Sequence, residues 1–193
     1  MKKICLLLLF IKASCTANTQ QQSFDITSFT APKGWKKQTT ESAVQFSKED
    51  ATTGAYCMIT LLKAIPGTAD AKANFDAAWE TVVKEMVKVS TAPAMQPVSK
   101  EDGWEAQSGY AAFENEGEKG VALLVTSTGY EKMVTILILT NTDAFEKDMT
   151  AFLESVSFKK QSIANNKPLA KSEKNTVPVP NAKKDGFAFT TTN

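Results

Sequence analysis

Three glutamates at alternate positions have the side chains that a hard cation would need. Glu114, Glu116 and Glu118 stand in a polar, glycine-containing stretch at residues 114–119. Carboxylate oxygens are preferred ligands of Ca²⁺, so a weak calcium site is one interpretation. The spacing of an EF-hand loop is absent, and alternate residues of a hairpin turn normally face solvent. The stretch therefore predicts a solvated turn, and no metal ligand is assigned.

The side chains most used in catalysis are scarce. All 22 basic residues are lysines, and the sequence contains neither Arg nor His. Histidine is the usual general base and metal ligand, and Arg is the best clamp for carboxylate or phosphate. The sequence also lacks a G-x-S-x-G motif and a Gly-rich phosphate loop. We therefore expect no enzyme, and no catalytic residue and no cofactor is assigned.

Four aromatic residues are candidates for lining a groove that takes a peptide or a glycan: Trp35, Trp104, Tyr110 and Tyr130. Aromatic rings in β-rich domains more often pack in the core or on a sheet face, and this second interpretation stays open. Trp104 and Tyr110 are six residues apart on one expected strand, so they share a face. These four residues are the predicted partner contacts. A net charge of +1 without clustered basic residues predicts no binding to nucleic acid.

The first 17 residues have the pattern of a signal peptide. A lysine-containing start precedes an apolar run at residues 4–11 and a small, polar segment at residues 12–17. Two processing routes fit: cleavage before Asn18, or a lipobox-like Ala13-Ser14-Cys15 that would leave a lipid on Cys15. Lys12 argues against the lipobox, whereas residues 18–23 would make a natural polar tether. Either route places the protein outside the cytoplasm, in the periplasm, on the envelope surface or secreted, and a lipid on Cys15 would anchor it to a membrane.

Processing leaves Cys57 as the lone cysteine of the folded part. An unpaired cysteine in an exported protein is either a reactive thiol or an intermolecular partner. A free cysteine is also among the most buried residue types. Its neighbours at residues 55–62 read as an apolar strand, so the core interpretation is favoured.

The most apolar internal stretch, residues 133–140, predicts the centre of a sheet. It alternates β-branched and other apolar residues, so both of its faces need cover. Short polar connections join it to expected strands at residues 104–113 and 120–128. Such short connections allow only antiparallel pairing, so the three strands form a meander.

Two amphipathic helices are expected to supply the cover. Residues 71–89 carry an apolar stripe of helical spacing after Asp70, a suitable N-cap, and residues 143–158 carry another after a capping box of Asp143 and Glu146. Further strands are expected at residues 24–29, 35–39, 43–47 and 55–63. The prediction is an α+β fold with a central, mostly antiparallel sheet of about six to seven strands, covered by two main helices.

The folded domain is expected to span residues 24–160. Residues 161–186 hold three prolines and no aromatic residue, which is typical of a flexible linker or tail. Residues 187–193 then alternate like the start of a further strand or module.

The order of elements, with Ala31-Pro32-Lys33-Gly34-Trp35 after the first strand of an exported chain, resembles the PsbP-like superfamily. Bacterial envelope lipoproteins of the DcrB type are similar. The resemblance implies an α/β/α sandwich around an antiparallel sheet. It also implies a binding or assembly factor without a shared catalytic set, and it carries over no site residues.

The leading hypothesis is a non-catalytic, extracytoplasmic binding or assembly module of the bacterial cell envelope, with an unknown envelope protein or component as partner. One alternative is a small-ligand carrier, which predicts a closed apolar pocket of about 300 Å³ or more under the first helix. Another is an accessory domain of an enzyme whose catalytic part is not in this chain. The sequence does not determine the oligomeric state.

Overall fold

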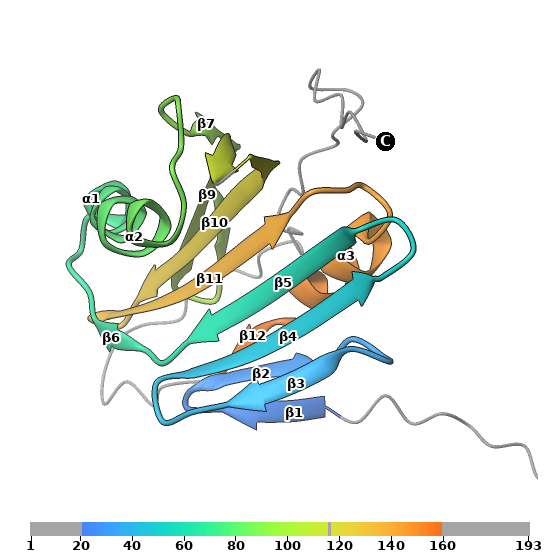
Figure 1. Cartoon of the computed structure of the whole chain (residues 1–193). Helices are drawn as coiled ribbons and strands as arrows, with labels where there is room; N and C mark the ends of the chain where they lie inside the picture. Colours follow the sequence, from blue (N-terminus) through green and yellow to red (C-terminus); the bar gives the residue numbers. More distant parts are fainter. Residues whose placement is uncertain (1–20, 116, 160–193) are drawn as a thin grey trace, which may run out of the picture.

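The computed structural model describes residues 21–115 and 117–159 of the chain (Figure 1). A nine-stranded antiparallel sheet is flanked by helices on both faces, and a three-stranded sheet lies beside it. The predicted α+β fold is therefore confirmed. The predicted signal peptide at residues 1–17, Cys15, the linker at residues 161–186 and the segment at residues 187–193 lie outside the described residues.

The large sheet contains the predicted meander. Its strand order is β3 (Lys36–Thr39), β4 (Ala43–Asp50), β5 (Ala55–Leu62), β11 (Lys132–Thr140), β10 (Glu118–Gly129), β9 (Trp104–Asn115) and β7 (Ala94–Met95). Two short strands lie off this path: β6 (Ile65–Pro66) pairs with β11, and β8 (Ser99–Glu101) pairs with β9. All pairs are antiparallel.

Strand β11 lies in the middle of this order and is apolar on both sides. Alternate residues enter two separate cores, with Val134, Ile136 and Ile138 in one and Met133, Leu137 and Leu139 in the other. Successive side chains of a strand point to opposite faces, so both faces must be shielded from water. The prediction of cover on both faces is confirmed.

The first face is covered by a helix that runs through α1 (Ala71–Ala78), the π-helical turn η1 (Trp79–Val83) and α2 (Lys84–Met86). The Asp70 carboxylate accepts a hydrogen bond from the Ala73 amide at 3.0 Å, as predicted for the N-cap. The helix ends before the predicted residue 89, because Val87 adopts an extended conformation and Val89 forms a bridge to Phe113.

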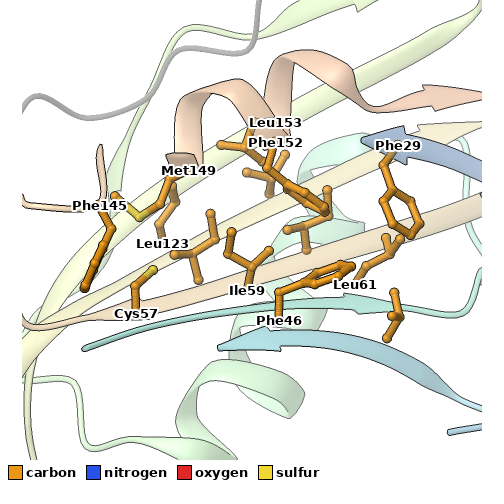
Figure 2. Packing of buried hydrophobic residues seen from close by; sticks show 14 of the residues in the cluster. Phe29, Phe46, Cys57, Ile59, Leu61, Leu123, Phe145, Met149, Phe152 and Leu153 are labelled. Carbon is orange, nitrogen blue, oxygen red and sulfur yellow. The ribbon is translucent and has the colours of Figure 1, made fainter. Parts of the chain in front are cut away.

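The second face is covered by α3 (Glu146–Ser155) and by the small sheet of β1 (Gln21–Phe24), β2 (Thr27–Thr30) and β12 (Ser157–Phe158). Figure 2 shows the side chains of α3 and its N-cap directed at the sheet, from Phe145, Met149, Phe152 and Leu153 toward Cys57, Ile59 and Leu123. The Phe152 ring lies 5.6 Å from that of Phe29 and 5.8 Å from that of Phe46. This aromatic cluster joins the helix to both sheets.

Two sequence predictions at the start of the fold need correction. The single strand expected at residues 24–29 is a hairpin, because Asp25 adopts a positive φ of 52° and reverses the chain between β1 and β2. Part of the polar tether expected at residues 18–23 belongs to β1, where Gln21 pairs with Thr30. Strand pairing uses backbone groups, so polar side chains did not reveal it.

The start of α3 also differs from the prediction. The N-cap is Phe145, without a side-chain cap hydrogen bond, rather than Asp143 as expected from the capping box. The Phe145 ring instead packs against Trp35 at 5.8 Å. Burial of this ring therefore positions the first turn of the helix.

Candidate binding site

A hollow of about 420 Å³ lies on the second face, where α3 and β12 meet the end of the large sheet. Helix α3 has ten residues and β10 has twelve, which corresponds to about 15 Å of helix against about 40 Å of strand. So short a helix leaves part of that face without cover. The hollow is lined by Thr30, Ser99, Glu101, Asp102, Trp104, Ala106, Val125, Ser127, Tyr130, Ile136, Leu153, Glu154, Ser155, Val156, Ser157 and Phe158.

The floor of the hollow combines apolar side chains with hydroxyl groups. Alternation along β9 and β10 directs Ala106, Val125 and Ser127 into the hollow, and Ser99 enters it from β8. Ser99 is only 9% exposed and Ser127 only 7%. Neither hydroxyl forms a side-chain hydrogen bond with another described residue. Both are therefore available to a bound group.

An aromatic wall closes one side of the hollow. Trp104 stacks on Phe158 with centroids 4.3 Å apart and meets the Tyr130 ring edge to face at 5.7 Å. The Tyr130 hydroxyl donates a hydrogen bond to the Asp102 carbonyl at 2.7 Å. A Cβ atom on Gly129 would lie 2.8 Å from the Trp104 ring, so only glycine allows this close approach. The wall is thus held in place by its own contacts.

The rim of the hollow is acidic. Glu101, Asp102 and Glu154 are exposed there, and none of them forms an ion pair with a described residue. The neighbouring Lys100 points to the other face of its strand, where it bonds to Glu105 at 2.7 Å. This hydrogen bond holds the pKa of the Glu105 carboxyl below its usual range.

The structure separates the four aromatic residues predicted as partner contacts into two pairs. Trp35 and Tyr110 are 8% and 5% exposed and belong to the core of the second face. The Trp35 indole donates a hydrogen bond to Asp148 of α3 at 3.0 Å. Neither residue lines the hollow, so their role as partner contacts stays a prediction. Trp104 and Tyr130, in contrast, come together in the wall of the hollow.

The alternate glutamates flank the turn between β9 and β10. Glu114 and Glu118 are exposed, and Glu114 lies 3.8 Å from Lys119, while Glu116 is outside the described residues. Within residues 21–115 and 117–159, no group of three His, Cys, Asp or Glu side chains could hold a metal ion.

Cys57 lies in the core of the second face and is 1% exposed. Burial raises the pKa of its thiol to about 12, although a hydrogen bond with Thr140 acts in the opposite direction. The thiol is therefore protonated at neutral pH and is an apolar core group, which agrees with the interpretation favoured from the sequence.

Several lining residues escaped the sequence analysis. The sequence predicted that Phe158 ends a helix, whereas the residue belongs to β12. Ser127 belongs to the polar run Thr126-Ser127-Thr128, which follows the apolar residues 121–125 of β10, and such a run is a usable signal for a polar cavity floor. The rim carboxylates carry no comparable signal, because exposed acids occur throughout the chain.

Comparison with known proteins identifies a distant structural likeness and no family. No protein-family model matches the chain, and neither does any curated protein. A solved crystal structure from Bacteroides thetaiotaomicron VPI-5482 is similar over 70% of this chain, with 17% sequence identity and a TM-score of 0.44. The match spans 46% of that protein's length. Among the described residues, no helix has the length and apolarity needed to cross a membrane.

Proposed function

We propose that this chain is a non-catalytic binding module of the bacterial cell envelope that works outside the cytoplasm. The observation that carries the proposal is the hollow of about 420 Å³ beside Trp104, Tyr130 and Phe158. Its volume lies within the range of small-molecule pockets, about 300–1,000 Å³. Apolar walls with a few convergent polar groups are also typical of such pockets.

Two further features support this function. The signal-peptide pattern of residues 1–17 favours export. The antiparallel sheet with helices on both faces is what the resemblance to the PsbP-like superfamily and to DcrB-type envelope proteins implies. Members of that superfamily are generally binding or assembly factors, and we propose the same kind of function for this chain.

The hollow differs in position from the pocket that a carrier was expected to have. That pocket was expected under the first helix, whereas the hollow lies on the opposite face, at the C-terminal end of α3. It is also lined by exposed carboxylates rather than by apolar groups alone. These features favour recognition of an accessible ligand or partner group over enclosed transport.

Filling the hollow tests the proposal. The purified chain and an Ala106→Leu, Ser127→Leu variant would each be incubated with native envelope extract. Bound proteins and small molecules would then be identified by mass spectrometry. We expect a specific component to be recovered with the native chain and lost with the filled variant. Equal recovery by both would reject the hollow as the binding site.

A matched variant controls for added apolar surface. Ala73→Leu and Ala77→Leu add comparable bulk to exposed positions of α1, on the other side of the sheet. This variant should recover the same component as the native chain. Far-ultraviolet circular dichroism and thermal unfolding would establish that all three proteins are folded. The same mass spectra would show whether Cys15 carries a lipid.

A further inference from the structure

The charges around the hollow have one sign. Glu101 and Asp102 line it from one segment and Glu154 from another, and no lysine is among its lining residues. The chain as a whole is close to neutral, with 22 basic and 21 acidic residues, so this imbalance is local. Clefts lined by one sign of charge concentrate ligands of the opposite sign.

The C-terminal end of α3 adds to the negative potential. Leu153, Glu154 and Ser155 of its last turn line the hollow. A helix C-terminus carries a partial negative charge that Lys or Arg normally balances. The last turn of α3 contains no basic residue and has Glu154 instead. A cation bound in the hollow would therefore balance both the helix end and the carboxylates.

The floor contributes hydrogen-bond acceptors to the same site. The residues Ser99 and Ser127 are more than nine-tenths buried and line the hollow, and their hydroxyls form no side-chain hydrogen bond with another described residue. An ammonium group has three N–H donors and no acceptor, so it can be satisfied by hydroxyl and carboxylate oxygens together. Ala106, Val125 and Ile136 supply an apolar surface next to these oxygens.

We propose that the hollow binds a small organic cation that has an ammonium head and an apolar stem. This inference rests on the proposed binding function and names the chemistry of the ligand. The ammonium group lies among the rim carboxylates and the two serine hydroxyls. The stem packs on the apolar floor and on the exposed part of the Phe158 ring.

A matched series of three probes tests the charge preference. Hexylammonium, hexanoate and 1-hexanol each have an unbranched chain of six carbons, with a positive, a negative and a neutral head. Each would be titrated into the purified, ¹⁵N-labelled chain at low salt and followed by two-dimensional NMR. We expect hexylammonium to shift the Trp104 indole signal and the amides around Ser127, with an affinity about tenfold above that of hexanoate. Raising the ionic strength should reduce this difference.

Neutralising the rim identifies the groups responsible. The variant Glu101→Gln, Asp102→Asn, Glu154→Gln keeps side-chain shape, and Asn tolerates the positive φ of 48° at position 102. We expect it to weaken hexylammonium binding about tenfold without changing that of 1-hexanol.

The control variant removes three charges elsewhere. Glu41→Gln, Glu49→Gln and Glu85→Gln alter exposed carboxylates that do not line the hollow. This variant should bind hexylammonium like the native chain. Equal weakening by both triple variants would overturn the proposal, because net charge alone would then explain the effect.

The probe series separates this inference from the proposed function. Hexanoate or 1-hexanol binding at the hollow as tightly as hexylammonium would overturn the cation inference and leave the binding function standing. The absence of shifts around the hollow with all three probes would also overturn it. The proposed function has its own test in the recovery of an envelope component by the native and filled chains.

Discussion

The two faces of the large sheet are covered in different ways. On the first face, the helix through α1, η1 and α2 spans residues 71–86, and its side chains Phe75, Trp79 and Val83 are at most 3% exposed. On the second face, the ten residues of α3 share the cover with three short strands. The first arrangement builds a continuous core. The second builds a core beside a hollow with a polar floor.

This contrast shows where the molecule can change without losing its fold. Side chains of the first face contact each other, as in the stacked rings of Phe75 and Trp79 at 5.9 Å. Residues of the hollow such as Ser99 and Ser127 have room beside them. Stability is therefore concentrated in the two cores, and the proposed binding site lies in the part of the second face that the helix does not reach.

The largest expected effects come from truncating the central phenylalanine of each core. Phe75→Ala and Phe152→Ala should each lower the free energy of unfolding by about 3–5 kcal/mol, because each leaves a cavity in a packed core. Phe158→Ala beside the hollow should cost about 1 kcal/mol, since this ring is only partly buried. Urea denaturation measures all three. Equal costs would show that the wall of the hollow belongs to the closed core.

A second effect depends on pH and concerns the core of the second face. Burial raises the pKa of Cys57 in the folded state to about 12. The protonated thiol therefore stabilises the fold fully below its usual pKa, and this stabilisation is lost as pH rises toward 12. The native chain should therefore lose about 2 kcal/mol more stability between pH 7 and 10 than a Cys57→Ala variant. Urea denaturation at both pH values measures the difference. Equal losses would show that Cys57 is not buried in solution.

Two buried tryptophans, one on each face of the sheet, allow a finer comparison of the two cores. The Trp35 indole donates to Asp148, whereas the buried Trp79 Nε1 on the first face has no hydrogen-bond partner among the described residues. Trp35→Phe should destabilise the protein by about 1 kcal/mol more than Trp79→Phe, because only the first substitution removes a hydrogen bond. Thermal unfolding of both variants measures this. The reverse order would indicate that Trp79 has a partner in solution.

The smallest expected change in stability comes from a substitution at the rim of the hollow that should affect stability and binding in opposite directions. Glu154→Lys places a positive charge at the C-terminal turn of α3, and it should stabilise the fold by about 0.5 kcal/mol. The same substitution should abolish the preference for hexylammonium, because it places a like charge at the rim. Unfolding and NMR titration measure the two effects. Retained cation preference would contradict the proposed role of the rim.

Most of the scaffold could be predicted because it depends on local periodicity. The stripe that begins at Phe75 identified the first helix, and the polar turn after Phe113 identified the meander. Errors occurred where tertiary contacts override local signals: Phe145 starts α3 by packing on Trp35, and Gln21 joins a strand through backbone pairing alone. Only two of the predicted partner contacts, Trp104 and Tyr130, line the candidate site.

The sequence by itself determined that both faces of β11 need cover, because the apolar residues of the stretch 133–139 point to both faces and must be removed from water. It also indicated export and the scarcity of catalytic side chains. Only the tertiary structure decided where the cover ends. The hollow depends on the reach of α3 relative to β10 and on segments near residues 100, 126 and 155, all of which line it. A periodic pattern records which residues are buried, whereas a cavity depends on the lengths and positions of elements that lie far apart in the chain.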